Sequence, residues 1–294
     1  MEKRATFSKL WLGMLFVLPQ ILLVFTFFYW PTGAALYWAF TLERPWGGGN
    51  DWVGLDNFRQ VFADRAYWAS ITRSLLFAGT TTVLSMGSGL LLALACDRGL
   101  KFRKAFQTLY VWPYAVVAPA AALAFRFIFA PEAGIFSLIA KSHPELWNPT
   151  QNGYHAMAMV IFCYSWKYAG LCFIFFLAAL QAIPRSVIEA SALDGASVLR
   201  RARDIQIPLI TPTIFFLIVI SITDSFQDSF GIVDVMTDGG PAKATELMVY
   251  KIYFDGFRGL DYSGAAAQSI VLMFIMMALT FFQFRFIEKR VHYS

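Results

Sequence analysis

The sequence predicts an all-α, polytopic membrane protein with six transmembrane helices. Of its 294 residues, 58% are hydrophobic and only 15% are charged, whereas soluble domains are nearer half apolar and a quarter charged. Six apolar stretches are each long enough to cross a bilayer, which takes about 20 residues of helix. Because only polar connections separate these stretches, we expect one transmembrane domain, residues 1–294, and no soluble domain.

The six predicted spans follow in order along the chain. The first, residues 10–39, is long, and Pro31 is expected to bend it near the outer surface. Lys3, Arg4 and Lys9 precede it as in a signal peptide, but the apolar run is too long for one, so an uncleaved first helix is predicted. The other five spans are residues 70–95, 105–129, 154–180, 209–233 and 264–287.

Basic residues predict the orientation of these spans, because cytoplasmic loops are enriched in Lys and Arg. With the N-terminus inside, 14 of the 24 Lys and Arg residues lie on the cytoplasmic side and 8 on the outer side, where the loops are longer. Both termini and the loop 181–208 are therefore predicted to be cytoplasmic. The net charge of +5 reflects this topology and does not indicate binding to nucleic acid.

The most informative stretch is the polar loop 181–208, between the fourth and fifth spans. A short helix is predicted first, and Asp194-Gly195 then signals a turn in which the glycine can take positive φ. A second short helix is expected over residues 196–206, and Pro208 marks the entry to the next span. The physical interpretation is a helix–turn–helix at the membrane surface that presents a knob to a partner protein.

The same loop resembles the EAA loop of the permease subunits of bacterial ABC importers. In that family, Glu-Ala-Ala is followed by Gly at the seventh position and by Ile-x-Leu-Pro after nine more residues. Here Glu189-Ala190-Ser191 leads to Gly195 and then to residues 205–208, Ile-Gln-Ile-Pro, in the same register. The resemblance implies a loop that docks into an ATPase, with contacts made by Glu189, Ala190, Ser191, Asp194, Gly195, Ile205 and Pro208.

Further stretches extend the resemblance over almost the whole chain. They are residues 53–58, 109–115, 180–186, 239–241 and 266–274. The chain is most similar to the first permease subunit of sn-glycerol-3-phosphate importers. This implies a type I importer fold in the bacterial inner membrane, a heterodimer with a second permease, two ATPase subunits and a periplasmic solute-binding protein. The implied cargo is glycerol 3-phosphate, with glycerophosphodiesters as a wider class.

The sequence predicts no enzyme chemistry in this chain. It has neither the G-x-x-x-x-G-K-[ST] motif for ATP nor H-E-x-x-H, and its three histidines are scattered. Cys96, Cys163 and Cys172 lie in or beside apolar runs without metal-binding spacing, so they are predicted to be buried apolar side chains. We therefore expect no metal and no cofactor here, with ATP and Mg²⁺ held by the partner ATPase, and membrane lipid rather than nucleic acid around the chain.

Polar residues within the predicted spans are candidates for the substrate path, because ionisable groups at bilayer depth usually face a bundle interior or an aqueous cavity. Lys167 and Asp224 lie about 21 and 24 Å of helix from the two ends of the 181–208 loop, so pairing of Lys167 with an aspartate is predicted. Both a purely structural ion pair and a cargo contact remain open. The candidates are Arg126, which is expected to snorkel, Lys167, Asp224, Gln227 and Asp228.

Two alternatives to glycerol 3-phosphate import stay open at this point. A permease for a sugar or polyol in the same superfamily would have the same motifs, because these motifs do not determine which cargo is transported. A secondary transporter would use the intramembrane carboxylates, but an EAA-like loop serves an ATPase and no inverted half-to-half repeat is found. The outer loops 41–69, 130–153 and 234–263 are expected either to meet the binding protein or to be plain solvated connections.

Overall fold

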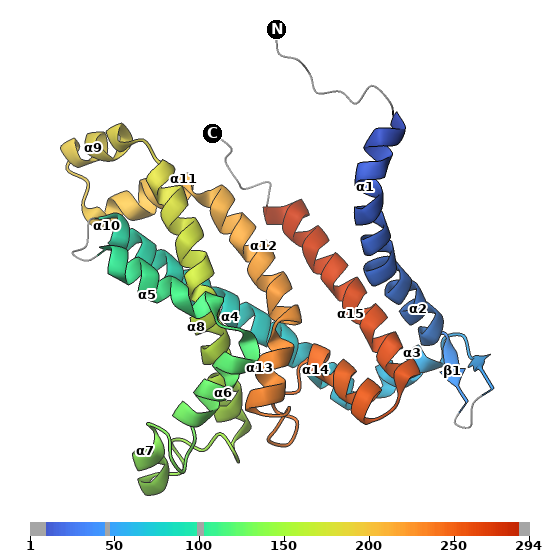
Figure 1. Cartoon of the computed structure of the whole chain (residues 1–294). Coiled ribbons are helices and arrows are strands. Elements are labelled where there is room, and N and C mark those ends of the chain that lie inside the picture. The colour runs from blue at the N-terminus through green and yellow to red at the C-terminus, as the bar shows by residue number, and fades with distance from the viewer. Residues whose placement is uncertain (1–9, 45–47, 99–102, 288–294) are drawn as a thin grey trace. The chain divides into compact units, whose positions relative to one another are not determined.

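The computed structural model describes residues 10–44, 48–98 and 103–287, and helices dominate these ranges (Figure 1). Four of the described helices are each long and apolar enough to cross a membrane: Gly13–Ala39, Arg65–Asp97, Gly153–Ala182 and Tyr262–Arg285. Two bent helix pairs raise the number of candidate spans to six when each pair is counted as one span. When each bent pair is counted as one span, the prediction of an all-α polytopic fold with six transmembrane helices is confirmed.

The contacts divide the chain into two units, which are described separately. The first unit falls within Met1–Asp64 and Ile252–Met273, and the second within Arg65–Lys251 and Phe274–Ser294. The single transmembrane domain expected over residues 1–294 stays a prediction.

The first unit begins with a long apolar helix that contains an irregular turn. Helix α1 (Leu10–Val24) continues through a π-helical turn, η1 (Phe25–Tyr29), into α2 (Trp30–Ala39). Pro31 lies at the start of α2, and its missing N–H leaves a carbonyl of the π turn without its usual donor. Residues 13–39 count as one helix, and the bend expected at Pro31 stays a prediction.

A β-hairpin and a short helix occupy the first predicted outer loop. Strands β1 (Thr41–Glu43) and β2 (Asn50–Trp52) pair antiparallel, and α3 (Asp56–Ala63) follows them. The buried side chain of Asn57 donates to the carbonyls of Ala39 and Thr41, at 3.0 and 2.9 Å. These two bonds hold α3 against the base of the hairpin, so this segment is an ordered element rather than a plain connection.

An ion pair links the two sides of the hairpin near its turn. The guanidinium of Arg44 donates to both carboxylate oxygens of Asp51, at 2.9 and 2.5 Å. This hydrogen bonding lowers the pKa of the exposed Asp51 carboxyl from its usual value.

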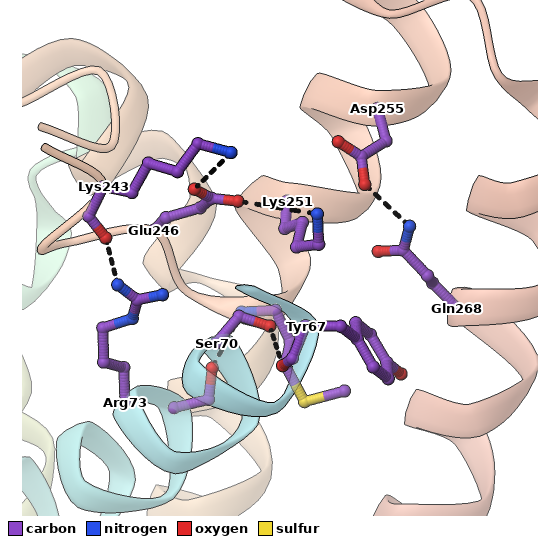
Figure 2. Close-up of polar contacts among 10 residues, drawn as sticks. Tyr67, Ser70, Arg73, Lys243, Glu246, Lys251, Asp255 and Gln268 are labelled. Atoms are coloured by element: carbon purple, nitrogen blue, oxygen red, sulfur yellow. Dashed lines mark hydrogen bonds and ion pairs between the residues drawn. The ribbon is translucent and has the colours of Figure 1, made fainter. Parts of the chain in front are cut away.

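The later part of the first unit contains η3 (Phe254–Arg258) and most of α15 (Tyr262–Phe282). Gln268 on α15 donates to the carboxylate of Asp255 at 2.7 Å (Figure 2). The carboxylate of Asp261 accepts from a backbone N–H in the first turn of α15 at 2.8 Å, as an N-cap does. The π-helical turn η4 (Gln283–Ile287) continues α15.

Two long helices, α4 (Arg65–Asp97) and α8 (Gly153–Ala182), form the core of the second unit. They approach most closely at Gly89, where an added Cβ would lie 2.8 Å from the Cβ of Cys172 and 2.9 Å from the backbone nitrogen of Phe173. A glycine at this position lets the two backbones pack against each other, as small residues do between membrane helices.

A third helix, α5 (Arg103–Ala115), packs on α8 in the same way. At Gly170, an added Cβ would lie 2.6 Å from the carbonyl oxygen of Tyr110 on α5. Apolar side chains fill the remaining space, and the predicted burial of the three cysteines is confirmed: Cys96, Cys163 and Cys172 are all buried and free.

The third predicted span, residues 105–129, is broken near its middle. Helix α5 ends at Ala115, and α6 (Ala118–Ile128) begins two residues later at an angle of 104°. Pro113 and Pro119 flank the break. Because proline lacks an N–H and clashes with the preceding turn, a straight helix does not continue through both.

The fifth span is also irregular. Helix α12 (Thr211–Gln227) is interrupted at Asp228 and resumes as α13 (Ser229–Met236), so this segment ends at Met236 rather than at residue 233. In Figure 1, α9 (Arg185–Leu193) lies at one end of the second unit and α7 (Ser137–Ser142) lies at the opposite end. The loop 181–208 and the second outer loop are thus at opposite ends of this unit, as the predicted topology requires.

Candidate functional site

The loop 181–208 forms the predicted helix–turn–helix. Helix α9 follows Pro184 and ends in a Schellman motif, in which the N–H of Ala196 bonds to the carbonyl of Ser191 and that of Gly195 to Ala192, both at 3.1 Å. Gly195 has a φ of +76°, so the positive φ predicted for this glycine is confirmed. The reversal of the chain at the tip of the loop depends on that conformation.

The second helix of the loop is longer than predicted. The side chain of Ser197 accepts from the N–H of Arg200 at 3.3 Å and caps its start. The helix then runs without a break through α10 (Val198–Arg201), a π-helical turn η2 (Ala202–Gln206) and α11 (Ile207–Leu209). The predicted end at residue 206 is wrong, because the helix continues through Pro208, which follows directly after the π-helical turn η2. The helix axis turns by 70° only before α12.

Most of the residues assigned to the ATPase contact lie on the surface of this loop. Glu189, Ala190, Asp194, Gly195 and Pro208 are exposed, Ile205 is half-buried, and Ser191 is buried. The hydroxyl of Ser191 donates to the carbonyl of Ile188 at 2.7 Å, so Ser191 shapes α9 rather than facing solvent. Two apolar side chains project beside the turn: Leu193 is 90% exposed and Leu199 is 77% exposed. Exposed leucines next to charged residues are typical of a docking surface.

The C-terminal end of α4 and the residue after it hold the second helix of the loop in place. The carboxylate of Asp97 accepts from the buried side chain of Gln206 at 3.3 Å, and Arg98 donates to the carbonyl of Val198 at 3.4 Å. Sequence reasoning missed Asp97 and Arg98 as parts of this site. The only indication of them in the sequence is that these two charged residues follow directly after an apolar run.

Lys167 lies at the midpoint of α8 and is only 6% exposed. Its Nζ lies 4.8 Å from the ring centroid of Tyr168 and 5.3 Å from that of Tyr114. Within the described residues, no carboxylate forms a direct ion pair with Lys167. The predicted direct pairing of Lys167 with an aspartate is therefore wrong, because the faces of two tyrosine rings occupy that place.

One tyrosine nevertheless connects the lysine to an aspartate. The hydroxyl of Tyr168 donates to the carboxylate of Asp228, which is exposed at the break between α12 and α13. Asp224 is half-buried one turn earlier, and Gln227 is exposed. The structure thus brings Lys167 and Asp228 to the same tyrosine. The tyrosines were missed as site residues, although Tyr164 and Tyr168, four residues apart beside Lys167, share one face of an apolar helix.

Arg126 is not part of this group. It is exposed in the last turn of α6 and donates to the carbonyl of Val235 at 3.1 Å, in the last turn of α13. A cation suits this position because the carbonyl end of a helix carries partial negative charge. Val235 is seven residues beyond Asp228, or about 10 Å along a helix, so Arg126 lies further from the loop 181–208 than Asp228 does.

The segment between α13 and α14 (Met248–Tyr253) folds back onto the outer part of α4 (Figure 2). The N–H of Met248 donates to the hydroxyl of Ser74 at 2.8 Å, and the guanidinium of Arg73 donates to the carbonyl of Lys243. The buried carboxylate of Glu246 lies 3.7 Å from Lys243 Nζ and 3.9 Å from Lys251 Nζ. This part of the third outer loop is therefore packed into the fold and is not a plain solvated connection.

No group of three or more His, Cys, Asp or Glu side chains is placed to hold a metal ion in residues 10–44, 48–98 and 103–287. What the geometry offers is a buried cation between aromatic faces in mid-helix and an exposed knob at one end of the unit.

Comparisons with known proteins agree with this architecture. Residues 85–293 match the family of binding-protein-dependent transport system inner membrane components. A crystallised bacterial ABC transporter involved in the import of the acidic polysaccharide alginate has the same fold, with a TM-score of 0.83 and 24% identity over 95% of this chain and 96% of that one. The fold is thus that of an ABC-importer permease. The chain belongs to the family of inner membrane components of binding-protein-dependent transport systems and is a multi-pass membrane protein.

The curated relatives are similar over nearly their whole length. The sn-glycerol-3-phosphate transport system permease protein UgpA of Rhizobium meliloti is 44% identical over 99% of this chain and all of that protein. Its counterpart in Brucella abortus is also 44% identical over the same shares. The Yersinia enterocolitica protein is 42% identical over all of this chain and 99% of its own length.

Proposed function

We propose that this chain is one of two different permease subunits of an importer that carries sn-glycerol 3-phosphate across the bacterial inner membrane. Glycerophosphodiesters form the wider cargo class. The names of the relatives that are 42–44% identical support this cargo. The observation that carries the proposal is Lys167, a buried cation in mid-helix that lies on tyrosine rings and forms no direct ion pair with a carboxylate in the described chain.

Lys167 suits an anionic cargo for an energetic reason. A phosphate ester that enters a low-dielectric passage needs a nearby positive charge, because an unpaired anion there is very costly. A cation–π contact is worth about 0.5–2 kcal/mol, so the two rings hold the ammonium group without competing strongly with a phosphate. Asp228, which reaches the same tyrosine, repels the phosphate and keeps the contact transient. Transient binding is what a passage requires, since cargo must also leave.

The energy comes from two separate ATPase subunits, which bind ATP and Mg²⁺. The knob around Gly195 docks into an ATPase subunit, with Leu193 and Leu199 in an apolar cleft and Glu189 or Asp194 beside a basic side chain of the partner. A periplasmic solute-binding protein delivers cargo to the opposite side. In this arrangement both chain termini and α9 are cytoplasmic.

Reconstitution with the partner subunits tests this proposal. Proteoliposomes that contain the two permeases and the ATPase are supplied with the binding protein and labelled glycerol 3-phosphate. We expect ATP-dependent uptake that unlabelled glycerol 3-phosphate and glycerophosphodiesters suppress and that neutral sugars do not. No uptake of labelled glycerol 3-phosphate, together with ATP-dependent uptake of a labelled sugar or polyol, would assign the cargo to that class. Uptake without the ATPase would instead indicate a secondary transporter.

A further inference from the structure

A cavity of about 860 Å³ opens between the outer part of α4 and the first turns of α8. Its lining changes chemistry with depth along both helices. Arg73 on α4 and Asn152, which precedes α8, are polar, whereas most lining residues one to two turns further in are apolar: Leu76, Phe77, Met157 and Ile161. Thr80 also lines this part, and its hydroxyl donates to the carbonyl of Leu76 within α4. The cavity therefore has a polar end and an apolar end, both within the second unit.

The polar end lies at the level of lipid headgroups. The 33 residues of α4 make a helix about 50 Å long, whereas the hydrocarbon core is about 30 Å thick, so about 10 Å of helix projects at each side. Arg73 is eight residues from the start of α4, or about 12 Å, which places it close to the hydrocarbon boundary. Tyr154, which is 88% exposed in the first turn of α8, and the exposed Trp68 on α4 fit the aromatic belt at this level.

Several hydrogen-bond donors at this end have no acceptor within the described chain. Arg73 donates to the carbonyl of Lys243 (Figure 2). The buried carboxylate of Glu246 acts on its charge electrostatically without a direct salt bridge, and that carboxylate is shared with Lys243 and Lys251. The carboxamide nitrogens of Gln151 and Asn152, which also line the cavity, donate no hydrogen bond to any described residue. The one carboxylate in the lining, Glu145, lies 2.9 Å from the ring of His143.

We propose that this cavity binds one anionic phospholipid of the leaflet opposite the coupling loop. The phosphate oxygens accept from Arg73 and from the amides of Gln151 and Asn152, and one acyl chain lies along Leu76, Met157 and Ile161. Glu246 is the one carboxylate that acts on Arg73, and it also faces Lys243 and Lys251, so this cluster has an excess of positive charge that selects an anionic headgroup over a zwitterionic one. The lining of the cavity changes from polar to apolar with depth, which fits a molecule that is polar at one end and apolar at the other.

Native mass spectrometry of the whole importer complex tests the site. The complex is reconstituted with equal phosphatidylglycerol and phosphatidylcholine, extracted in mild detergent, and examined for retained lipid. We expect one phosphatidylglycerol per complex, with retention reduced roughly tenfold in Arg73→Gln, because a charge-assisted contact is lost. Arg65→Gln, which removes an exposed arginine from the same helix, should retain the lipid as the wild type does.

A second variant keeps the test decisive if Arg73→Gln assembles poorly. Met157→Trp fills the apolar end and leaves Arg73 in place, so it should also release the phosphatidylglycerol. Equal retention in all variants, or equal retention of phosphatidylcholine, would overturn the proposal. A disulfide between a cysteine at Thr80 and the second permease would likewise overturn it, because the cavity would then be a subunit interface.

Discussion

At the scale of single residues, Tyr168 has two roles that can be separated. Its ring lies under Lys167, and its hydroxyl donates to Asp228. The hydroxyl keeps the carboxylate occupied, so that the carboxylate does not pair with the lysine. Loss of the hydroxyl alone should therefore allow an internal ion pair that competes with an anionic cargo.

Tyr168→Phe should lower the uptake rate of glycerol 3-phosphate several-fold at low cargo concentration, with less effect at saturation. Tyr114→Phe is the matched control, because its ring also lies on Lys167 but its hydroxyl has no hydrogen bond within the described residues. The double variant Tyr168→Phe/Asp228→Asn should recover part of the lost affinity. Equal effects of the two tyrosine variants would contradict a separate role for the Tyr168 hydroxyl.

Gly195 is the second residue with a specific conformational requirement. Alanine at a φ of +76° costs about 1–2 kcal/mol, asparagine costs less, and proline can neither reach that φ nor supply the N–H that bonds to Ala192. We expect all variants to assemble. The uptake rate should fall in the order glycine, asparagine, alanine and proline at position 195, with little uptake in Gly195→Pro. Uptake by the proline variant at the wild-type rate would argue against a coupling role for this turn.

At the scale of elements, the apolar runs predicted the spans well, but the breaks depend on local chemistry. Pro113 and Pro119 were visible in the sequence, yet the 104° angle between α5 and α6 follows from packing on α8 as well as from the prolines. The hairpin formed by β1 and β2 was missed, because its strands are only three residues long. Short strands have too little periodicity for a pattern to detect.

The contact between α4 and α8 can be tested through its closest approach. Gly89→Ala should destabilise the packing by about 1–3 kcal/mol, because the new Cβ meets the backbone of Phe173 and the Cβ of Cys172. Gly87→Ala on the same helix is the control, since nothing lies within 4 Å of its Cβ position. Thermal inactivation of the purified complex measures the difference. Equal stability of the two variants would show that the helices adjust freely at this point.

At the scale of the whole molecule, charge counting predicts the orientation, which stays a prediction, and the helix–turn–helix over residues 181–208 followed from a sequence pattern. The side chains that contact Lys167 could not be predicted in this way. Hydropathy indicates how deep a residue lies along a membrane helix, but it does not indicate which side chain fills the space beside Lys167. An ion pair with Asp224 or Asp228 was the expectation, and two tyrosine rings occupy that place. Contacts of this kind depend on helix rotation, which no single sequence specifies.

The orientation itself is open to a labelling experiment. The three native cysteines are buried, so an impermeant thiol reagent should label only introduced cysteines. We expect Leu55→Cys to be labelled from the periplasm and Ser186→Cys, on α9, only from the cytoplasmic side, since both positions are exposed. The reverse pattern would overturn the proposed topology and the position of the ATPase with it.

The central claim is that Lys167 provides the positive charge for an anionic cargo. Lys167→Met keeps the length of the side chain and removes the charge, and Lys167→Arg keeps the charge. In proteoliposomes with the ATPase and the binding protein, we expect Lys167→Met to lose most uptake of glycerol 3-phosphate and to retain most ATPase stimulation by the binding protein. Lys167→Arg should retain measurable uptake. If Lys167→Met assembles and transports at the wild-type rate, Lys167 is not part of the cargo path. If uptake by Lys167→Met is lost only because the complex fails to assemble, and Asp228→Asn restores it, the charge is structural and the account is contradicted.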